Sequence, residues 1–163
     1  MATKTTYYII GASALLLLLT MKTNKLLAAI ANPFKIRGSD PFGSGAYGAS
    51  RGDRKHEGVD IVTIPGQDIF SPITGKVVRI AYPYGNDLNY KGLLIENTNY
   101  EVKIFYIAPV ANIVGTHVMA GQKVAIAQNI SAKHGAAMIN HAHIEVRNKK
   151  TKLLINPTNL FKL

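Results

Sequence analysis

Residues 141–147 read HAHIEVR and place two of the chain's five histidines one residue apart. The apolar and β-branched residues around them favour a strand. Side chains at positions i and i+2 of a strand share a face, so His141 and His143 should lie side by side while Ala142 and Ile144 turn away. Two imidazoles on one face suit two metal ligands, or one ligand beside a catalytic base. The alternative is a pair of histidines that are only hydrogen-bonded or solvated.

Short apolar runs separated by turn residues fill most of the sequence. Their intervals of roughly 8–12 residues are typical of an all-β domain. No amphipathic helix longer than about two turns is visible beyond the N-terminal segment, and no internal repeat is apparent. We therefore predict a mainly β domain with strands in these runs: VDIVTI (59–64), IFSPI (69–73), GKVVRIAY (75–82), GLLIEN (92–97), EVKIFYI (101–107), QKVAIA (122–127), HAHIEVR (141–147) and KLLINP (152–157).

A second polar cluster lies in KHEGVD, residues 55–60. His56 and Asp60 are four residues apart, but Gly58 and the β-branched residues that follow argue against a helix. A loop that turns into a strand would let His56 fold back towards Asp60. An imidazole and a carboxylate arranged in this way can share one cation, although the spacing alone is a weak signal.

The composition limits the chemistry of any such site. The 163-residue chain has no cysteine, so disulfides, thiolate zinc sites and cysteine nucleophiles are excluded, and a metal must be held by histidine and carboxylate. The formal net charge of +10 favours polyanionic partners such as nucleic acid, anionic lipid or acidic cell-wall polymers. The basic residues are scattered and show no DNA-binding motif, so we expect no nucleic-acid partner.

Taken together, the two clusters suggest a metal site. His56, Asp60 and one histidine of the 141/143 pair form an N/N/O set of three ligands, which leaves a fourth position for water, as in catalytic zinc sites. Zinc polarises carbonyl groups and lowers the pKa of bound water. The ligand types fit Zn²⁺ without excluding Mn²⁺ or Co²⁺.

The motifs HEGVDI, SPITGKVV, MAGQKVA and HAHIEVR, in this order, resemble the lysostaphin and LytM-type zinc endopeptidases, which cut peptide cross-bridges in bacterial peptidoglycan. The resemblance runs from about Phe42 to Phe161. Two stretches, GAYGASRGDRKHEGVDI (45–61) and VKIFYIAPV (102–110), are similar to the leukocyte cell-derived chemotaxin branch of the same fold.

This resemblance implies a mostly antiparallel β-sheet with a metal in a groove between loops. It assigns zinc to His56, Asp60 and His143, and gives His141 a catalytic role as proton acceptor or transition-state donor. It also implies peptidoglycan as the substrate.

One position departs from the family pattern. Active members carry a second catalytic histidine in a Y-x-H-L stretch, whereas this chain has Tyr106 followed by Ala108 at the histidine position. Alanine cannot transfer a proton, and an acid–base group typically contributes ~10²–10⁴-fold to a rate. The chemotaxin branch is similarly altered and is regarded as a zinc-bearing binding protein. We place Tyr106 and Ala108 in the expected substrate groove.

Other residues are candidates to compensate. His134 lies in the loop before the 141–147 strand and is the better-placed histidine, whereas His117 is expected to be solvated. Tyr84 and Tyr106 could offer phenol donors, or simply pack. A further residue, Glu145, either orients an imidazole or is an ordinary exposed charge.

The N-terminal residues 7–21, YYIIGASALLLLLTM, carry no charge. We expect residues 1–31 to form a single-pass membrane anchor, with the span extended to Ala31 by snorkelling of Lys22 and Lys25. A signal peptide cut after AIA (29–31) and a buried core helix are the alternatives. The location would be a bacterial envelope or the membrane of a virus particle.

The expected organisation is thus the anchor, a linker over residues 32–41, and a peptidase-like domain over residues 42–163. The leading hypothesis is a membrane-anchored zinc endopeptidase acting on peptidoglycan, such as a lytic enzyme carried by a phage particle. The alternatives are a zinc-binding module whose chemistry is lost at Ala108, and a structural membrane protein. The sequence leaves the oligomeric state open.

Overall fold

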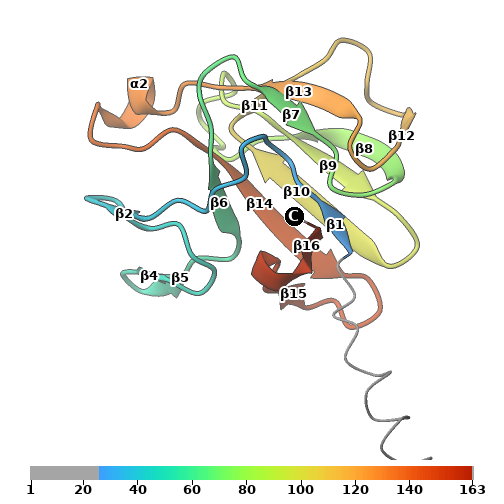
Figure 1. Cartoon of the computed structure of the whole chain (residues 1–163), viewed down its shortest axis with the longest axis horizontal. Helices are drawn as coiled ribbons and strands as arrows, with labels where there is room; N and C mark the ends of the chain where they lie inside the picture. The colour runs from blue at the N-terminus through green and yellow to red at the C-terminus, as the bar shows by residue number, and fades with distance from the viewer. Residues whose placement is uncertain (1–25, 163) are drawn as a thin grey trace, which may run out of the picture.

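The computed structural model describes residues 26–162, and its largest element is a seven-stranded sheet (Figure 1). Every pairing within this sheet is antiparallel. The strands follow the order β12 (His117–Val118), β8 (Gly75–Ala81), β9 (Gly92–Glu96), β10 (Tyr100–Phe105), β14 (His141–Asn148) and β15 (Leu154–Ile155), with β6 (Val59–Val62) also paired to β14.

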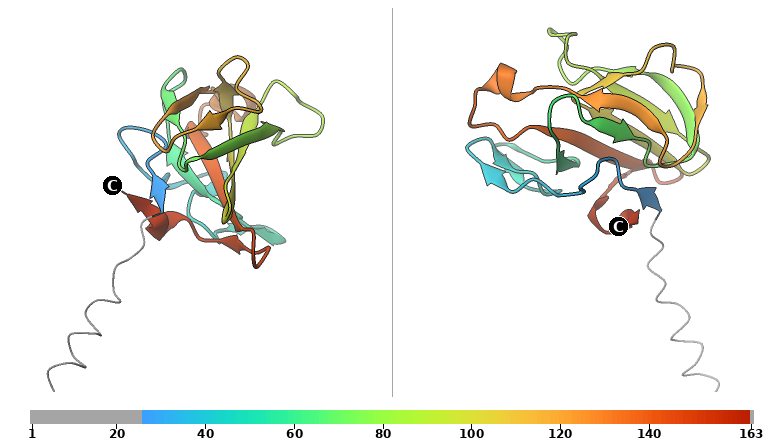
Figure 2. Two further views of the ribbon diagram at one scale, coloured as in Figure 1. Left: turned by 90° about the vertical axis from the view of Figure 1, so that its right-hand side faces the viewer. Right: turned by 45° about the horizontal axis from the view of Figure 1, so that its top comes forward.

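A smaller antiparallel sheet packs against the larger one (Figure 2). Its order is β11 (Ile107–Pro109), β13 (Lys123–Ala127) and β7 (Asp68–Phe70). Ile69, Ile107 and Val124 of this sheet join Leu93 and Ile104 of the larger sheet in one hydrophobic core. The alternation of apolar residues, read as strands in the sequence, thus supplies one buried face to each sheet.

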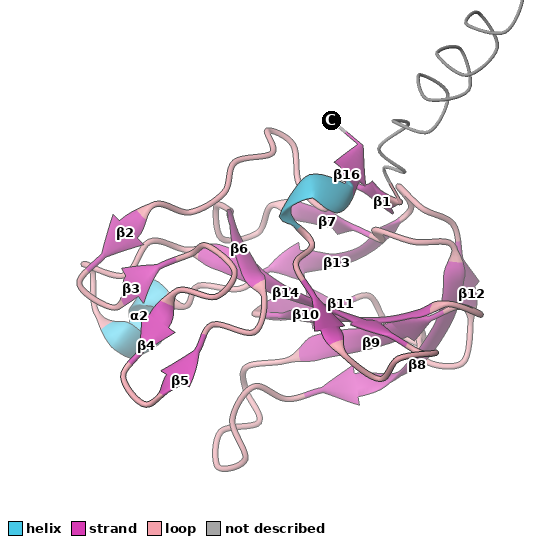
Figure 3. Cartoon of the chain, turned by 90° about the horizontal axis from the view of Figure 1, so that it is seen from below, coloured by secondary structure: helices cyan, strands magenta, loops and turns pink. Residues whose placement is uncertain are grey.

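Two short hairpins gather at one end of the molecule, near the four-residue helix α2 (Ser131–His134) (Figure 3). One hairpin pairs β2 (Ser39–Asp40) with β3 (Gly43–Ser44), and the other pairs β4 (Ser50–Arg51) with β5 (Arg54–Lys55). The sequence indicated an irregular loop here because these strands are too short to show a period-two pattern.

The strand predictions are confirmed. Every apolar run named above contains a strand, and the resulting domain is mainly β and antiparallel, as expected. Apart from α2, the described helical structure is a single 3₁₀ turn, η1 (Thr158–Leu160).

The start of the domain differs from the expected boundaries. β1 (Leu27–Ala28) pairs in parallel with β16 (Phe161–Lys162), and Leu27, Ile30 and Ala31 are buried in the core. The supposed linker is also folded, since Ile36 forms a bridge with Ile61. Residues 27–41 therefore belong to the domain, because Leu27, Ile30 and Ala31 are buried by protein and Ile36 bridges to β6.

The first part of the expected anchor, residues 1–25, lies outside the described residues. Within residues 26–162, none of the helices has the length and apolar character needed to cross a membrane.

Candidate metal centre

The pairing of β6 with β14 brings the two polar clusters of the sequence together. In this register His143 faces Asp60 directly, and His141 faces Val62. His141 and His143 occupy the same face of β14, as the i, i+2 spacing predicts. His56 precedes β6 and folds back so that its ring packs 4.8 Å, centroid to centroid, from the ring of His143.

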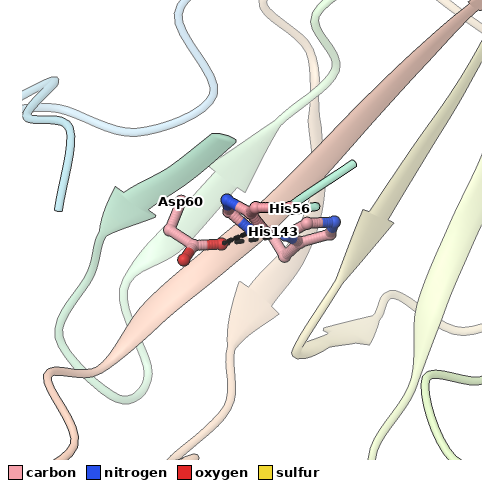
Figure 4. A group of neighbouring side chains, drawn as sticks. All are labelled: His56, Asp60 and His143. Carbon is pink, nitrogen blue, oxygen red and sulfur yellow. Dashed lines mark hydrogen bonds and ion pairs between the residues drawn. The ribbon is translucent and has the colours of Figure 1, made fainter. Parts of the chain in front are cut away.

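Three donor atoms converge on one point (Figure 4). Asp60 Oδ1 lies 2.8 Å from His143 Nδ1 and 3.2 Å from His56 Nε2, and the two ring nitrogens are 2.9 Å apart. Each of the three residues offers one ligand atom to a shared ion, and all three are largely buried. The predicted ligands therefore do meet, although they come from positions up to 87 residues apart.

The second nitrogen of each ligand histidine has its own partner, and this decides whether the cluster fits a metal. His56 Nδ1 lies 2.8 Å from the carbonyl oxygen of Ala46, to which it can only donate. His56 Nε2 is thus left unprotonated in the neutral ring, as a metal ligand must be. On the other side, His143 Nε2 lies 3.4 Å from Glu145 Oε1, which leaves Nδ1 for the metal. The donor set therefore fits zinc.

Glu145 is a buried partner of this cluster, which supports the orienting role over that of an exposed strand charge. Burial works to raise its pKa, but hydrogen bonds from His143 and Lys103 outweigh burial and lower the pKa to about 2. Lys103 Nζ lies 3.0 Å from Glu145 Oε2. Glu145 therefore stays ionised and can hold the ring of His143 in one orientation.

The second oxygen of Asp60 is held by a residue that sequence reasoning missed. Arg37 donates to Asp60 Oδ2 from Nε at 3.1 Å and from Nη2 at 2.9 Å, and it is buried. It also donates to the carbonyl of Gly43 at 3.0 Å and pairs with Asp40. Burial works to raise the pKa of Asp60, but the side chains of His143 and His56 within 3.2 Å of Oδ1 outweigh burial and hold that pKa far below its usual range.

The sequence signal for Arg37 is a charge next to the apolar residues Phe34 and Ile36, but the composition of residues 32–41 predicts a linker. Because two nitrogens of Arg37 donate to Oδ2 of Asp60, only Oδ1 is left to face the cluster.

His141 lies beside the three ligands. Its Nε2 is 3.7 Å from Asp60 Oδ1, and its Nδ1 lies 2.7 Å from the carbonyl oxygen of Ile139. Burial lowers the pKa of His141, which keeps the ring neutral with Nε2 as a free acceptor. His141 is therefore placed to act as a base without being one of the three metal ligands.

The cluster opens into a groove of about 450 Å³. His134 and the two candidate tyrosines, Tyr84 and Tyr106, line it, but Ala108 does not: it lies on β11 opposite Ile126. His117 is exposed on β12 and also does not line the groove. The lining residues are Arg37, Phe42, Arg51, Arg54, His56, Asp60, Tyr82, Pro83, Tyr84, Phe105, Tyr106, Ile130, His134, Met138, His141, His143 and Glu145.

This combination defines a class of protein: a mainly β fold that carries a His–Asp–His zinc-type site in a groove, with a further histidine next to it. Within that class, residues 54–157 match the model of Peptidase family M23, and the chain belongs to this family. The resemblance stated from the motifs is therefore confirmed.

Individual relatives agree with this placement. The chain is 39% identical over 77 residues to leukocyte cell-derived chemotaxin-2 of Mus musculus, which covers 47% of this chain and 51% of the relative. The chain thus spans about half the length of the first curated relatives it matches.

Two solved structures show the same fold. The catalytic domain of the antimicrobial peptidase lysostaphin from Staphylococcus simulans aligns with a TM-score of 0.51 and 22% identity, over 72% of this chain and 82% of that one. A zinc containing peptidase from Vibrio cholerae aligns with a TM-score of 0.55 and 23% identity, over 80% of this chain and 38% of that one.

Proposed function

We propose that the protein is a zinc metalloendopeptidase that hydrolyses peptide bonds in bacterial peptidoglycan. The observation that carries the proposal is the convergence of His56, Asp60 and His143 in a groove, with the free Nε2 of His141 beside them. Zinc held by these three side chains would polarise the substrate carbonyl and lower the pKa of water.

The chain's own residues have distinct roles in this reaction. His141 Nε2 accepts the proton of the attacking water and can pass it to the departing amine. Asp60 and the two ligand histidines are held in place by Arg37, Glu145 and the carbonyl of Ala46. The net charge of +10 would draw the protein to an acidic cell wall.

The proposal includes attachment to a membrane by the N-terminal segment. Because Leu27 is buried in the domain, such an anchor would lie within residues 7–25, which span about 28 Å as a helix, close to the roughly 30 Å hydrocarbon core. An anchored enzyme would be held next to the wall, in a bacterial envelope or in the membrane of a phage particle.

Turnover tests the proposal. Full-length protein in detergent, loaded with zinc, is incubated with purified peptidoglycan, and new amino termini are counted beside a His141→Ala variant. We expect release by the wild type and a loss of ~10²–10⁴-fold in the variant. Equal release by both proteins would rule out the enzyme.

The second candidate is a zinc-binding module, and Ala108 is the observation that favours it. If the wild type binds zinc without turnover, and Ala108→His then gains turnover, the site is a decayed peptidase. Metal analysis excludes the third candidate, a purely structural membrane protein, if the wild type binds zinc and His56→Ala does not.

A further inference from the structure

The residue that links the two sheets carries a backbone conformation that its side chain disfavours. β10 ends at Phe105 and β11 begins at Ile107, so the chain passes from the larger to the smaller sheet at Tyr106. Tyr106 has a φ of 64°, in the left-handed region, and its carbonyl accepts a hydrogen bond of 2.9 Å from the Gln128 amide.

A bulky residue in this region is strained, and glycine would make the same turn freely. Such strain gathers at functional sites, where the side chain is needed in one place. Of the other described non-glycine residues with positive φ, Asn112 lies in a turn and Lys152 in the loop between β14 and β15. Tyr106 is the one that lines the groove.

The ring of Tyr106 lies against the proposed base. Its centroid is 5.4 Å from that of His141, and the rings meet edge to face at 87°. Burial raises the pKa of Tyr106 far above its usual range, so the phenol keeps its proton and remains a donor. The Tyr106 phenol therefore lies next to His141, which itself lies beside the three metal ligands.

Two further groove residues hold this phenol in place. The Tyr106 hydroxyl hydrogen bonds to Tyr84, whose own hydroxyl lies 2.7 Å from His134 Nε2. Because this hydrogen bond raises the pKa of Tyr106, the Tyr106 hydroxyl is its donor, and its O–H can turn from Tyr84 to a carbonyl oxygen bound in the groove. Lys133 Nζ, 4.6 Å from the Tyr84 ring centroid, adds a cation–π contact.

We propose that the Tyr106 hydroxyl, positioned by Tyr84 and His134, donates the hydrogen bond to the substrate carbonyl oxygen that Ala108 cannot supply. This inference rests on the proposed peptidase function. Tyr106 is the catalytic residue, because it touches the reacting carbonyl. Tyr84 and His134 are positioning residues that act through Tyr106. His134, which the sequence suggested as a replacement for the missing histidine, thus has a positioning role.

Tyr106→Phe is the central test, because it removes one oxygen and keeps the ring that packs on His141. In the zinc-loaded full-length protein, we expect kcat to fall by about 10²-fold, the loss typical of one oxyanion donor, with KM and zinc content unchanged. Tyr100→Phe, at the other end of β10, is the matched control and should keep wild-type kinetics.

The positioning residues are tested by rescue and by a double variant. His134→Gln retains an amide that can donate to Tyr84, so it should keep more kcat than His134→Ala. Because Tyr84 and His134 act through the same hydroxyl, Tyr84→Phe/His134→Ala should lose no more than the worse single variant. If Tyr106→Phe does not fold, the comparison of these single and double variants still tests whether Tyr84 and His134 act through the Tyr106 hydroxyl.

Each remaining outcome counts against the inference. Wild-type kcat in Tyr106→Phe, loss of zinc in that variant, or losses in the double variant that multiply would each overturn the donor role while leaving the peptidase intact. An inactive wild type would overturn the proposed function and this inference with it.

Discussion

At the scale of single residues, the site depends on the two oxygens of Asp60 having different partners. Oδ1 faces the two ligand histidines, while Oδ2 accepts two hydrogen bonds from Arg37. A buried carboxylate is costly unless it is paired, and Arg37 supplies the pairing without occupying the metal side. Arg37 should therefore tune the affinity of the site for zinc.

Replacing Arg37 by lysine tests this dependence. Lysine keeps the positive charge but cannot donate both hydrogen bonds that Arg37 gives to Oδ2, so Asp60 loses its fixed orientation. We expect zinc affinity to fall by about 10–100-fold, the usual effect of removing a partner of a metal ligand. Titration against a chelator of known affinity measures it. Arg79→Lys, on an exposed position of β8, is the control, and an equal loss in both would exclude the specific role.

At the scale of elements, one glycine sets how closely the loop before β6 passes β14. A Cβ at Gly58 would lie 2.3 Å from the Ile144 carbonyl oxygen and 2.7 Å from His143 Nε2. Neither the strand backbone nor a metal ligand can move away without cost. The glycine that argued against a helix in the sequence is thus required for the approach of His56 to His143.

Gly58→Ala should therefore destabilise the domain and weaken the metal site together. Overpacking of this kind typically costs about 1–3 kcal/mol, which denaturant unfolding would detect. Gly85→Ala is the matched control, since a Cβ there meets nothing within 4 Å. An unchanged free energy of unfolding in Gly58→Ala would show that the loop can shift away from β14.

At the scale of the whole molecule, the start of the described chain pairs with its end, because β1 lies beside β16. The adjacent leucines differ sharply, with Leu27 fully buried and Leu26 41% exposed. In a membrane span that continued to Ala31, both leucines would face an apolar environment. In the folded domain, only Leu27 does.

Leu27→Ala should cost about 2–5 kcal/mol of unfolding free energy, as for other buried leucines. Leu26→Ala should change it by less than about 0.5 kcal/mol. Denaturant unfolding of the two variants in detergent provides the comparison. Similar small changes in both would move the start of the domain beyond residue 27.

Much of this protein could be predicted from short-range patterns. The period-two alternation marked the strands, and the i, i+2 spacing of His141 and His143 put both rings on one face, because side-chain direction in a strand follows from local geometry alone. The ligands His56, Asp60 and His143 followed from residue chemistry together with the family motifs. These inferences needed no knowledge of which strands pair.

Only the tertiary structure decided what depends on long-range pairing. The register of β6 on β14 joins residues 79–85 positions apart, and neither strand specifies its partner locally. Long-range packing also buries Arg37 and keeps Ala108 out of the groove. It likewise brings the ring of Tyr106 against His141. A side chain's chemistry is written in the sequence, but its neighbours are set by the free energy of the whole fold.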